Sequence, residues 1–117
     1  MSFQSNVIAS AAPATGYAVP FSPAASTATV VCRSGEFWVR GTSTTPAAPT
    51  SPVGTGLVAG WNRMLAGDRL QIGIDVAANP ALWSLNAGSP GQLGAADPIA
   101  GLQVWCVTAG DLNIIGH

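Results

Sequence analysis

The sequence contains no lysine and very little charge of either sign. Charged residues make up 8% of the 117-residue chain, and the four arginines and five acidic residues leave a net charge of −1. Ordinary soluble proteins carry about 25% charged residues. A chain so poor in cations lacks the basic face that neutralises phosphates, so we expect no direct nucleic-acid partner. The shortage of charge predicts that other proteins cover much of the surface, because a lone soluble monomer usually needs more charge to resist association.

Long apolar runs and a secretory signal are also missing. No run approaches the roughly 18 residues that span a membrane, so we expect no membrane partner. The first ten residues, MSFQSNVIAS, have neither a cationic n-region nor a long apolar h-region. The chain is therefore not expected to carry a secretory signal peptide.

The residue types of catalytic and metal sites are scarce and scattered. The single histidine is His117, the terminal residue, where little can orient its ring, so we expect no Ser-His-Asp or Cys-His device. Asp68 and Asp75 lie on one extended segment, over about 20 Å apart, whereas glycosidase carboxylates lie about 5–9.5 Å apart. No acidic cluster resembles a calcium loop, and GSPGQLG has no lysine for a phosphate loop. These absences predict a protein that is not an enzyme and that holds no cofactor or metal.

The two cysteines, Cys32 and Cys106, lie in the apolar runs TVVCR and QVWCVT. Their wide separation does not match the C-x₂₋₄-C pairs of zinc sites. Either they are two buried core thiols on strands, or their strands are neighbours and the pair forms a disulfide worth about 4 kcal/mol. In a cytoplasm such a bond would form late, if at all.

The clearest pattern that is present is the alternation in GDRLQIGIDV, residues 67–76. It predicts a strand with one apolar face turned to a core, formed by Leu70, Ile72, Ile74 and Val76. The opposite face, with Arg69, Gln71 and Asp75, is interpreted as a wet or partner-facing surface without chemistry. We expect Asp68 to close the turn before this strand through bonds to the local backbone.

Short strands separated by Gly, Pro and Asn predict an all-β fold, a single antiparallel β-sandwich or jelly-roll-like barrel. The segment STATVVCRSGEFWVRG, residues 26–41, reads as a β-hairpin with its turn at RSGE. GLQVWCVTAG, residues 101–110, reads as another strand, and Val104 is expected to be fully buried, as is Ile72. The predicted hairpin is followed by the Thr/Pro-rich loop of residues 42–56, whose length is typical of a functional or mobile segment.

The chain divides by composition into an extended N-terminal arm, residues 1–26, and a β-sandwich domain, residues 27–117. The arm is uncharged and rich in Ala, Ser and Pro. Three of its apolar residues alternate as in a short edge strand that stops at Pro20: Tyr17, Val19 and Phe21. We expect the arm to cross the body or to reach a neighbour, and the alternative is a flexible tail.

Those three arm residues and five others are the candidates for a partner interface. The others are aromatic residues and arginines, types enriched at interfaces: Trp38, Arg40, Trp61, Arg63 and Arg69. Trp38 follows Phe37 in a strand, so the two side chains face opposite ways. Each arginine has a solvated alternative. Arg33 could pair with Glu36 across the predicted turn, and Arg63 and Arg69 could form a network with Asp68.

The pattern TVVCRSGEFWVRG … LAGDRLQIGIDV … PALWSL … GLQVWCV, over residues 27–107, resembles the small decoration or cement proteins on the heads of tailed bacteriophages. Where this chain departs from their usual hairpin, it has Arg33 before the turn. The resemblance is a pattern of strands and turns, and it carries over no site residues. It implies a virion β-sandwich, assembled in the host cytoplasm and forming a homo-oligomer, that binds the major capsid protein or other virion proteins.

Two further functions are weighed against that expectation. The first is a carbohydrate- or receptor-binding module of a tail or fibre, in which outward-facing Trp38 and Trp61 form a platform for sugars. The second is a small enzyme, which the scattered polar residues disfavour. Binding of the isolated chain to glycans would favour the first of these over a decoration protein.

Overall fold

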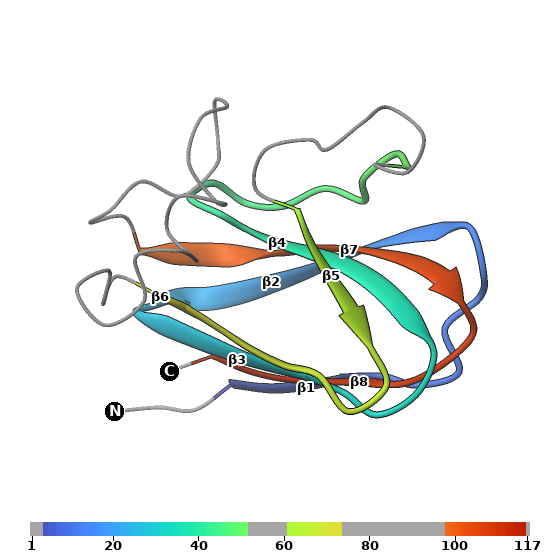
Figure 1. Ribbon diagram of the computed structural model, residues 1–117. Coiled ribbons are helices and arrows are strands. Elements are labelled where there is room, and N and C mark those ends of the chain that lie inside the picture. The colour runs from blue at the N-terminus through green and yellow to red at the C-terminus, as the bar shows by residue number, and fades with distance from the viewer. Residues whose placement is uncertain (1–3, 52–60, 74–97, 117) are drawn as a thin grey trace.

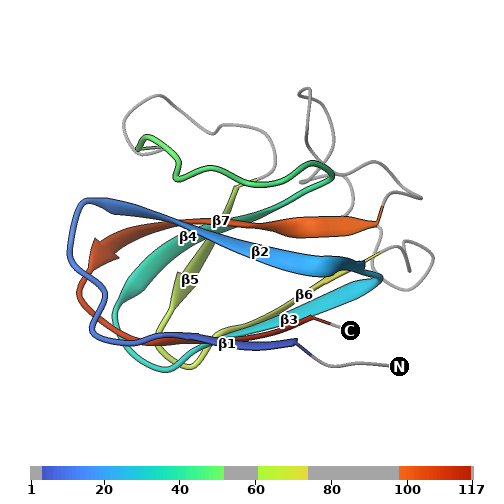
Figure 2. The same ribbon diagram turned by 180° about the vertical axis from the view of Figure 1, so that it is seen from behind.

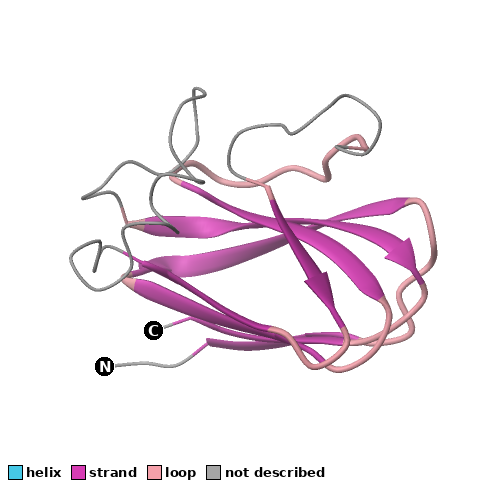
Figure 3. Ribbon diagram, in the orientation of Figure 1, coloured by secondary structure: helices cyan, strands magenta, loops and turns pink. Residues whose placement is uncertain are grey.

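The computed structural model describes residues 4–51, 61–73 and 98–116, and every regular element in them is a strand (Figures 1 and 3). The strands are β1 (Gln4–Ile8), β2 (Thr15–Ala25), β3 (Thr27–Cys32), β4 (Glu36–Thr42), β5 (Asn62–Leu65), β6 (Arg69–Gly73), β7 (Ile99–Thr108) and β8 (Leu112–Gly116). These three ranges contain no helix that is long enough and apolar enough to cross a membrane.

The strands form two antiparallel sheets packed face to face (Figures 1 and 2). Sheet A has the order β1-β8-β3-β6, and sheet B has the order β2-β7-β4-β5. Every neighbouring pair in both sheets is antiparallel. The predicted all-β fold is confirmed, in the form of a β-sandwich.

One apolar core fills the space between the sheets. Alternate residues of each strand turn inward, as in β3, where Ala28, Val30 and Cys32 are fully buried. Ile72 is 2% exposed and Val104 is 0% exposed, which confirms the strand phase predicted for both. Ile74 and Val76 lie outside the described residues.

The predicted hairpin of residues 26–41 is wrong in its pairing, although both of its strands exist. β3 pairs with β6 and β8 in sheet A, whereas β4 pairs with β5 and β7 in sheet B. The turn at Gly35, which has a φ of +81°, carries the chain from one sheet to the other. A glycine turn predicts only that the chain reverses. Here Cys32 and Phe37 both turn into the core, from opposite sheets, and this burial separates the two strands.

The division at residue 26 also needs correcting over the described residues, because both sheets contain part of the proposed arm. β1 pairs with β8 along Gln4–Ile8, and β2 pairs with β7. Val19 and Phe21 are 6% and 4% exposed and belong to the core. The predicted edge strand is present as β2. It continues past Pro20, where its pairing with β7 becomes irregular, and an edge strand tolerates proline because one side of its backbone needs no partner.

Candidate partner interface

The eight candidate residues are not gathered at one site. Val19 and Phe21 are in the core. Tyr17 is half-buried against it, and its hydroxyl accepts a hydrogen bond from the backbone N–H of Ala12 at 2.9 Å. All three therefore stabilise this chain's own fold. Of the remaining five, four lie on strands of the two sheets, and Trp61 lies just before β5.

Trp38 and Arg40 lie on the outer face of sheet B, since the residues that alternate with them, Phe37 and Val39, are fully buried. The alternation predicted for Phe37 and Trp38 is thus confirmed. Trp38 lies directly opposite Trp105 on β7, and its indole N–H is buried without a hydrogen-bond partner in the described part of the chain.

Arg40 is held in place by two neighbours. Its Nε donates a hydrogen bond to Oε1 of Gln103 at 2.7 Å, and its guanidinium lies over the ring of Trp61, 4.6 Å from the centroid. Burial lowers the pKa of Arg40. Only 5% of Trp61 is exposed, so Trp61 is not available to a partner in this conformation.

A proline-containing segment, residues 43–51, lies along the outer side of sheet B, and we call it the proline strap (Figure 1). The backbone oxygen of Ala47 in the strap accepts a hydrogen bond from Nε2 of Gln103 at 2.9 Å. Gly16 and Gly101 give the strap room: a Cβ on Gly16 would collide with Pro49, and one on Gly101 would lie 2.5 Å from Cγ of Pro46. The chain's own residues therefore cover part of this outer face.

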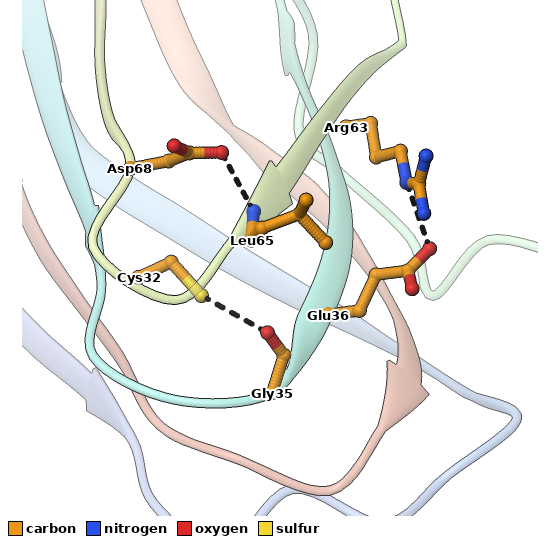
Figure 4. Close-up of polar contacts among 6 residues, drawn as sticks. All are labelled: Cys32, Gly35, Glu36, Arg63, Leu65 and Asp68. Atoms are coloured by element: carbon orange, nitrogen blue, oxygen red, sulfur yellow. Dashed lines mark hydrogen bonds and ion pairs between the residues drawn. The ribbon is translucent and has the colours of Figure 1, made fainter.

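Arg63 on β5 forms an ion pair with Glu36 on β4, with 3.0 Å between Nε and Oε2 (Figure 4). The register places Arg63 opposite Trp38 and thus diagonally next to Glu36. This corrects the expected partners: Glu36 pairs with Arg63 rather than with Arg33, and Arg63 is not part of a network with Asp68. Neighbours in the sequence suggested those pairs, whereas the pairing of β4 with β5 decides the contact.

Asp68 closes the turn between β5 and β6, as predicted. Its Oδ2 accepts a hydrogen bond from the backbone N–H of Leu65 at 2.8 Å, and its own N–H donates to the carbonyl of Leu65 at 2.9 Å (Figure 4). Gly67 in the same turn has a φ of +93°. These bonds give the carboxylate a structural role.

On the outer face of sheet A, two rows of side chains cross all four strands. The register defines the rows as Ser5–Ile115–Thr29–Gln71 and Val7–Asn113–Val31–Arg69. Arg69 is the only charged residue in these rows. Arg69 and Gln71 are exposed, as predicted, whereas Asp75 lies outside the described residues.

Sequence reasoning missed the two large apolar residues of this face, Val7 and Ile115, which are 62% and 41% exposed. Val7 lay in the proposed arm. Ile115 follows the buried Ile114, and nothing in the segment NIIG tells which isoleucine turns outward. Only the register with β1 and β3 places Ile115 on this surface.

Cys32 and Cys106 are free thiols, both fully buried in the core. The first of the two readings, buried core thiols on strands, is confirmed. Burial raises the pKa of both, and the negative charge of Asp68 raises that of Cys32 further. The Sγ of Cys106 donates to the carbonyl of Thr108 at 3.2 Å, and that of Cys32 to the carbonyls of the turn before β4 (Figure 4).

No three His, Cys, Asp or Glu side chains come together as metal ligands in the part of the chain that the structure describes. Comparison with known protein families, with curated proteins and with solved structures finds no match to this chain.

Proposed function

We propose that this protein is a non-enzymatic virion structural protein, a capsid decoration protein that binds the capsid lattice through the outer face of sheet A. The observation that carries the proposal is the contrast between the two outer faces. The proline strap lies along sheet B, whereas the rows on sheet A present a broad surface with Arg69 as their single charge. The resemblance to phage decoration proteins and the small number of charged residues in the chain agree with this role.

The chemistry of the sheet A face suits a protein partner. Four strands spaced about 4.8 Å apart present a surface about 15 Å wide. Its side chains are hydroxyls, amides and aliphatic groups, which lose little hydration energy on burial compared with charged groups. Arg69 makes no ion pair within the described ranges, so it can meet an acidic group on the capsid surface. We therefore expect Arg69 to be the residue of this face that contributes most to specificity.

The alternative, a carbohydrate-binding module of a tail or fibre, depended on Trp38 and Trp61 as an exposed platform. Trp61 is 5% exposed and lies beneath the guanidinium of Arg40, so the pair does not offer two free ring faces. No observation of the described residues favours this function over capsid binding.

The test is to mix the purified protein with capsids that lack accessory proteins and to image the particles. We expect ordered density on the lattice, reduced occupancy for Arg69→Glu, and normal occupancy for Arg33→Glu. Arg33 is a matched control because it too is exposed but lies in the turn between the sheets. Bare capsids with the wild-type protein would refute the proposal, and equal occupancy for both variants would show that the lattice meets another surface.

A further inference from the structure

Among the strands that the structure describes, the four at the sheet edges differ in how they are protected against pairing with another chain. Proteins protect such edges with proline, with charge or by keeping the strand short. β2 contains Pro20 and Pro23, β5 has four residues with Arg63 among them, and β6 begins at Arg69. β1, with the sequence QSNVI, has no proline and no charge, so it is the unprotected edge.

The side chain of Gln4, the first residue of β1, holds this strand in place. The Nε2 of Gln4 donates to the carbonyl of Pro23 at 2.6 Å, and its Oε1 accepts from the N–H of Ser22 at 2.8 Å. These two bonds tie β1 to β2 across the side of the sandwich. Among the described strands, β1 pairs with β8 alone, so the edge of its backbone that faces away from β8 has no strand partner there. An incoming strand would therefore meet an edge that is already ordered, which lowers the entropy cost of association.

The side chains beside this edge are apolar and exposed. Val7 on β1 is 62% exposed and Ile115 on the neighbouring β8 is 41% exposed. Ile115 lies directly opposite Ser5, which makes it a diagonal neighbour of Val7 on the same face. The unprotected backbone edge therefore lies beside Val7, the most exposed large apolar residue in the described part of the chain.

We propose that β1 pairs antiparallel with β1 of a second copy of this chain, about a two-fold axis at Asn6, so that sheet A continues across the dimer. This register places Ser5 opposite Val7 of the second copy and makes the two Val7 side chains diagonal neighbours on the same face. It brings no like charges together, because β1 has none. Self-pairing of β5 about Arg63 would instead place the two arginines opposite each other.

The second copy fits better than another partner because the edge is complementary to itself. A two-fold interface uses the same patch on both chains, so each contact occurs twice. On both sides of the axis, the exposed Val7 and Ile115 would then form one apolar cluster on the outer face. The inference does not depend on capsid binding, because dimers form or fail to form in the purified protein alone.

The experiment is sedimentation equilibrium on the untagged protein and on three single-lysine variants. We expect the wild type to dimerise with rising concentration, and Val7→Lys and Ser5→Lys to weaken the dimer about tenfold or more, because each introduces a charge at the shared edge. Thr29→Lys is the matched control. It lies on the same face but on β3, between β6 and β8, and should change the dimer constant little.

A charge-swap pair tests the register. Ser5→Glu and Val7→Lys proteins, each weakened alone, should form mixed dimers, because residue 5 of one copy lies opposite residue 7 of the other. Far-UV circular dichroism and thermal unfolding will establish that each variant is folded, and Ser5→Lys serves if Val7→Lys is not. A wild type that stays monomeric at its solubility limit would overturn the proposal. So would loss of the dimer in Thr29→Lys but not in the β1 variants, or failure of the mixture to dimerise.

Discussion

The carboxylate of Asp68 and the backbone N–H of Leu65 form a 2.8 Å hydrogen bond that fixes the reversal between β5 and β6. β5 belongs to sheet B and β6 to sheet A, so this turn connects the two layers at one side of the sandwich. The backbone of the turn also bonds to β3: the N–H of Gly67 donates to the carbonyl of Cys32, and the N–H of Cys32 donates to the carbonyl of Asp68. A single side chain thus supports the junction of three strands.

Replacing Asp68 with alanine should therefore lower the free energy of unfolding by about 0.5–2 kcal/mol, as the loss of a capping residue does. Chemical denaturation of both proteins measures the difference. Asp68→Asn keeps an acceptor oxygen and should lose less. A loss as small as that of an ordinary surface substitution, within about 0.5 kcal/mol, would contradict the role of this bond.

Truncation of two neighbouring residues of β6 should change stability by very different amounts. Ile72→Ala removes a side chain that is 2% exposed and should cost about 2–5 kcal/mol, because the sandwich cannot fully collapse around the cavity. Gln71→Ala, on the exposed face, should change stability by no more than about 0.5 kcal/mol. Equal effects in denaturant titrations would mean that the strand phase differs from the one described.

Gly16→Ala should loosen the proline strap. Its Cβ would collide with Pro49, including the backbone oxygen, so the strap has to move, and overpacking of this kind costs about 1–3 kcal/mol. Limited digestion with a protease of broad specificity, read by mass spectrometry, should show faster cleavage within residues 43–51. Ala18→Ser, at an exposed position of the same strand, is the control, and equal cleavage of the two variants would contradict the packing.

The two buried thiols should make stability fall at alkaline pH. Because the folded state raises the pKa of Cys32 and Cys106, it holds their protons more tightly than the unfolded chain does. Their stabilising contribution is complete below the ordinary thiol pKa of about 8.5 and is lost as the pH rises through the folded-state values. Denaturant titrations over that range test this, and Cys106→Ala should reduce the slope. A thiol reagent should also label the native protein far more slowly than the unfolded one.

Deleting residues 1–26 should leave a chain that does not fold cooperatively. The deletion removes β1 from sheet A and β2 from sheet B, and with them Val19 and Phe21 from the core. Thermal unfolding followed by circular dichroism provides the measurement. A cooperative transition in the truncated chain would restore the original division into an arm and an independent body.

The sequence predicted local features well because alternation and turn chemistry depend on near neighbours. The burial of Ile72 and Val104, the opposite faces of Phe37 and Trp38 and the capping role of Asp68 all follow from that local information. The pairing of strands does not, because it depends on contacts between residues distant in the chain. β3 and β4 were therefore expected to pair with each other, although burial of Cys32 and Phe37 directs them to opposite sheets.

The candidate interface was harder to predict for the same reason. Aromatic and arginine side chains were chosen by type, yet the register places Trp61 under Arg40 and pairs Arg63 with Glu36. The exposed face of sheet A is assembled from four separate segments, so no single stretch of sequence contains its pattern. Arg69 was the one candidate placed correctly on that face, because its own strand alternates clearly.

The pairing of β1 with β8 also limits when the protein can fold during synthesis. Gln4 pairs with Gly116 and Ile8 with Leu112, so strand partners lie more than 100 positions apart in the chain. Contacts of such long range form slowly, and on the ribosome β1 cannot pair with its strand partner until β8 has emerged from the exit tunnel. While the intervening residues are being translated, β1 remains unpaired. The strand with the least protected edge is therefore also the one whose strand partner is synthesised last. Aggregation of nascent chains should begin at this strand.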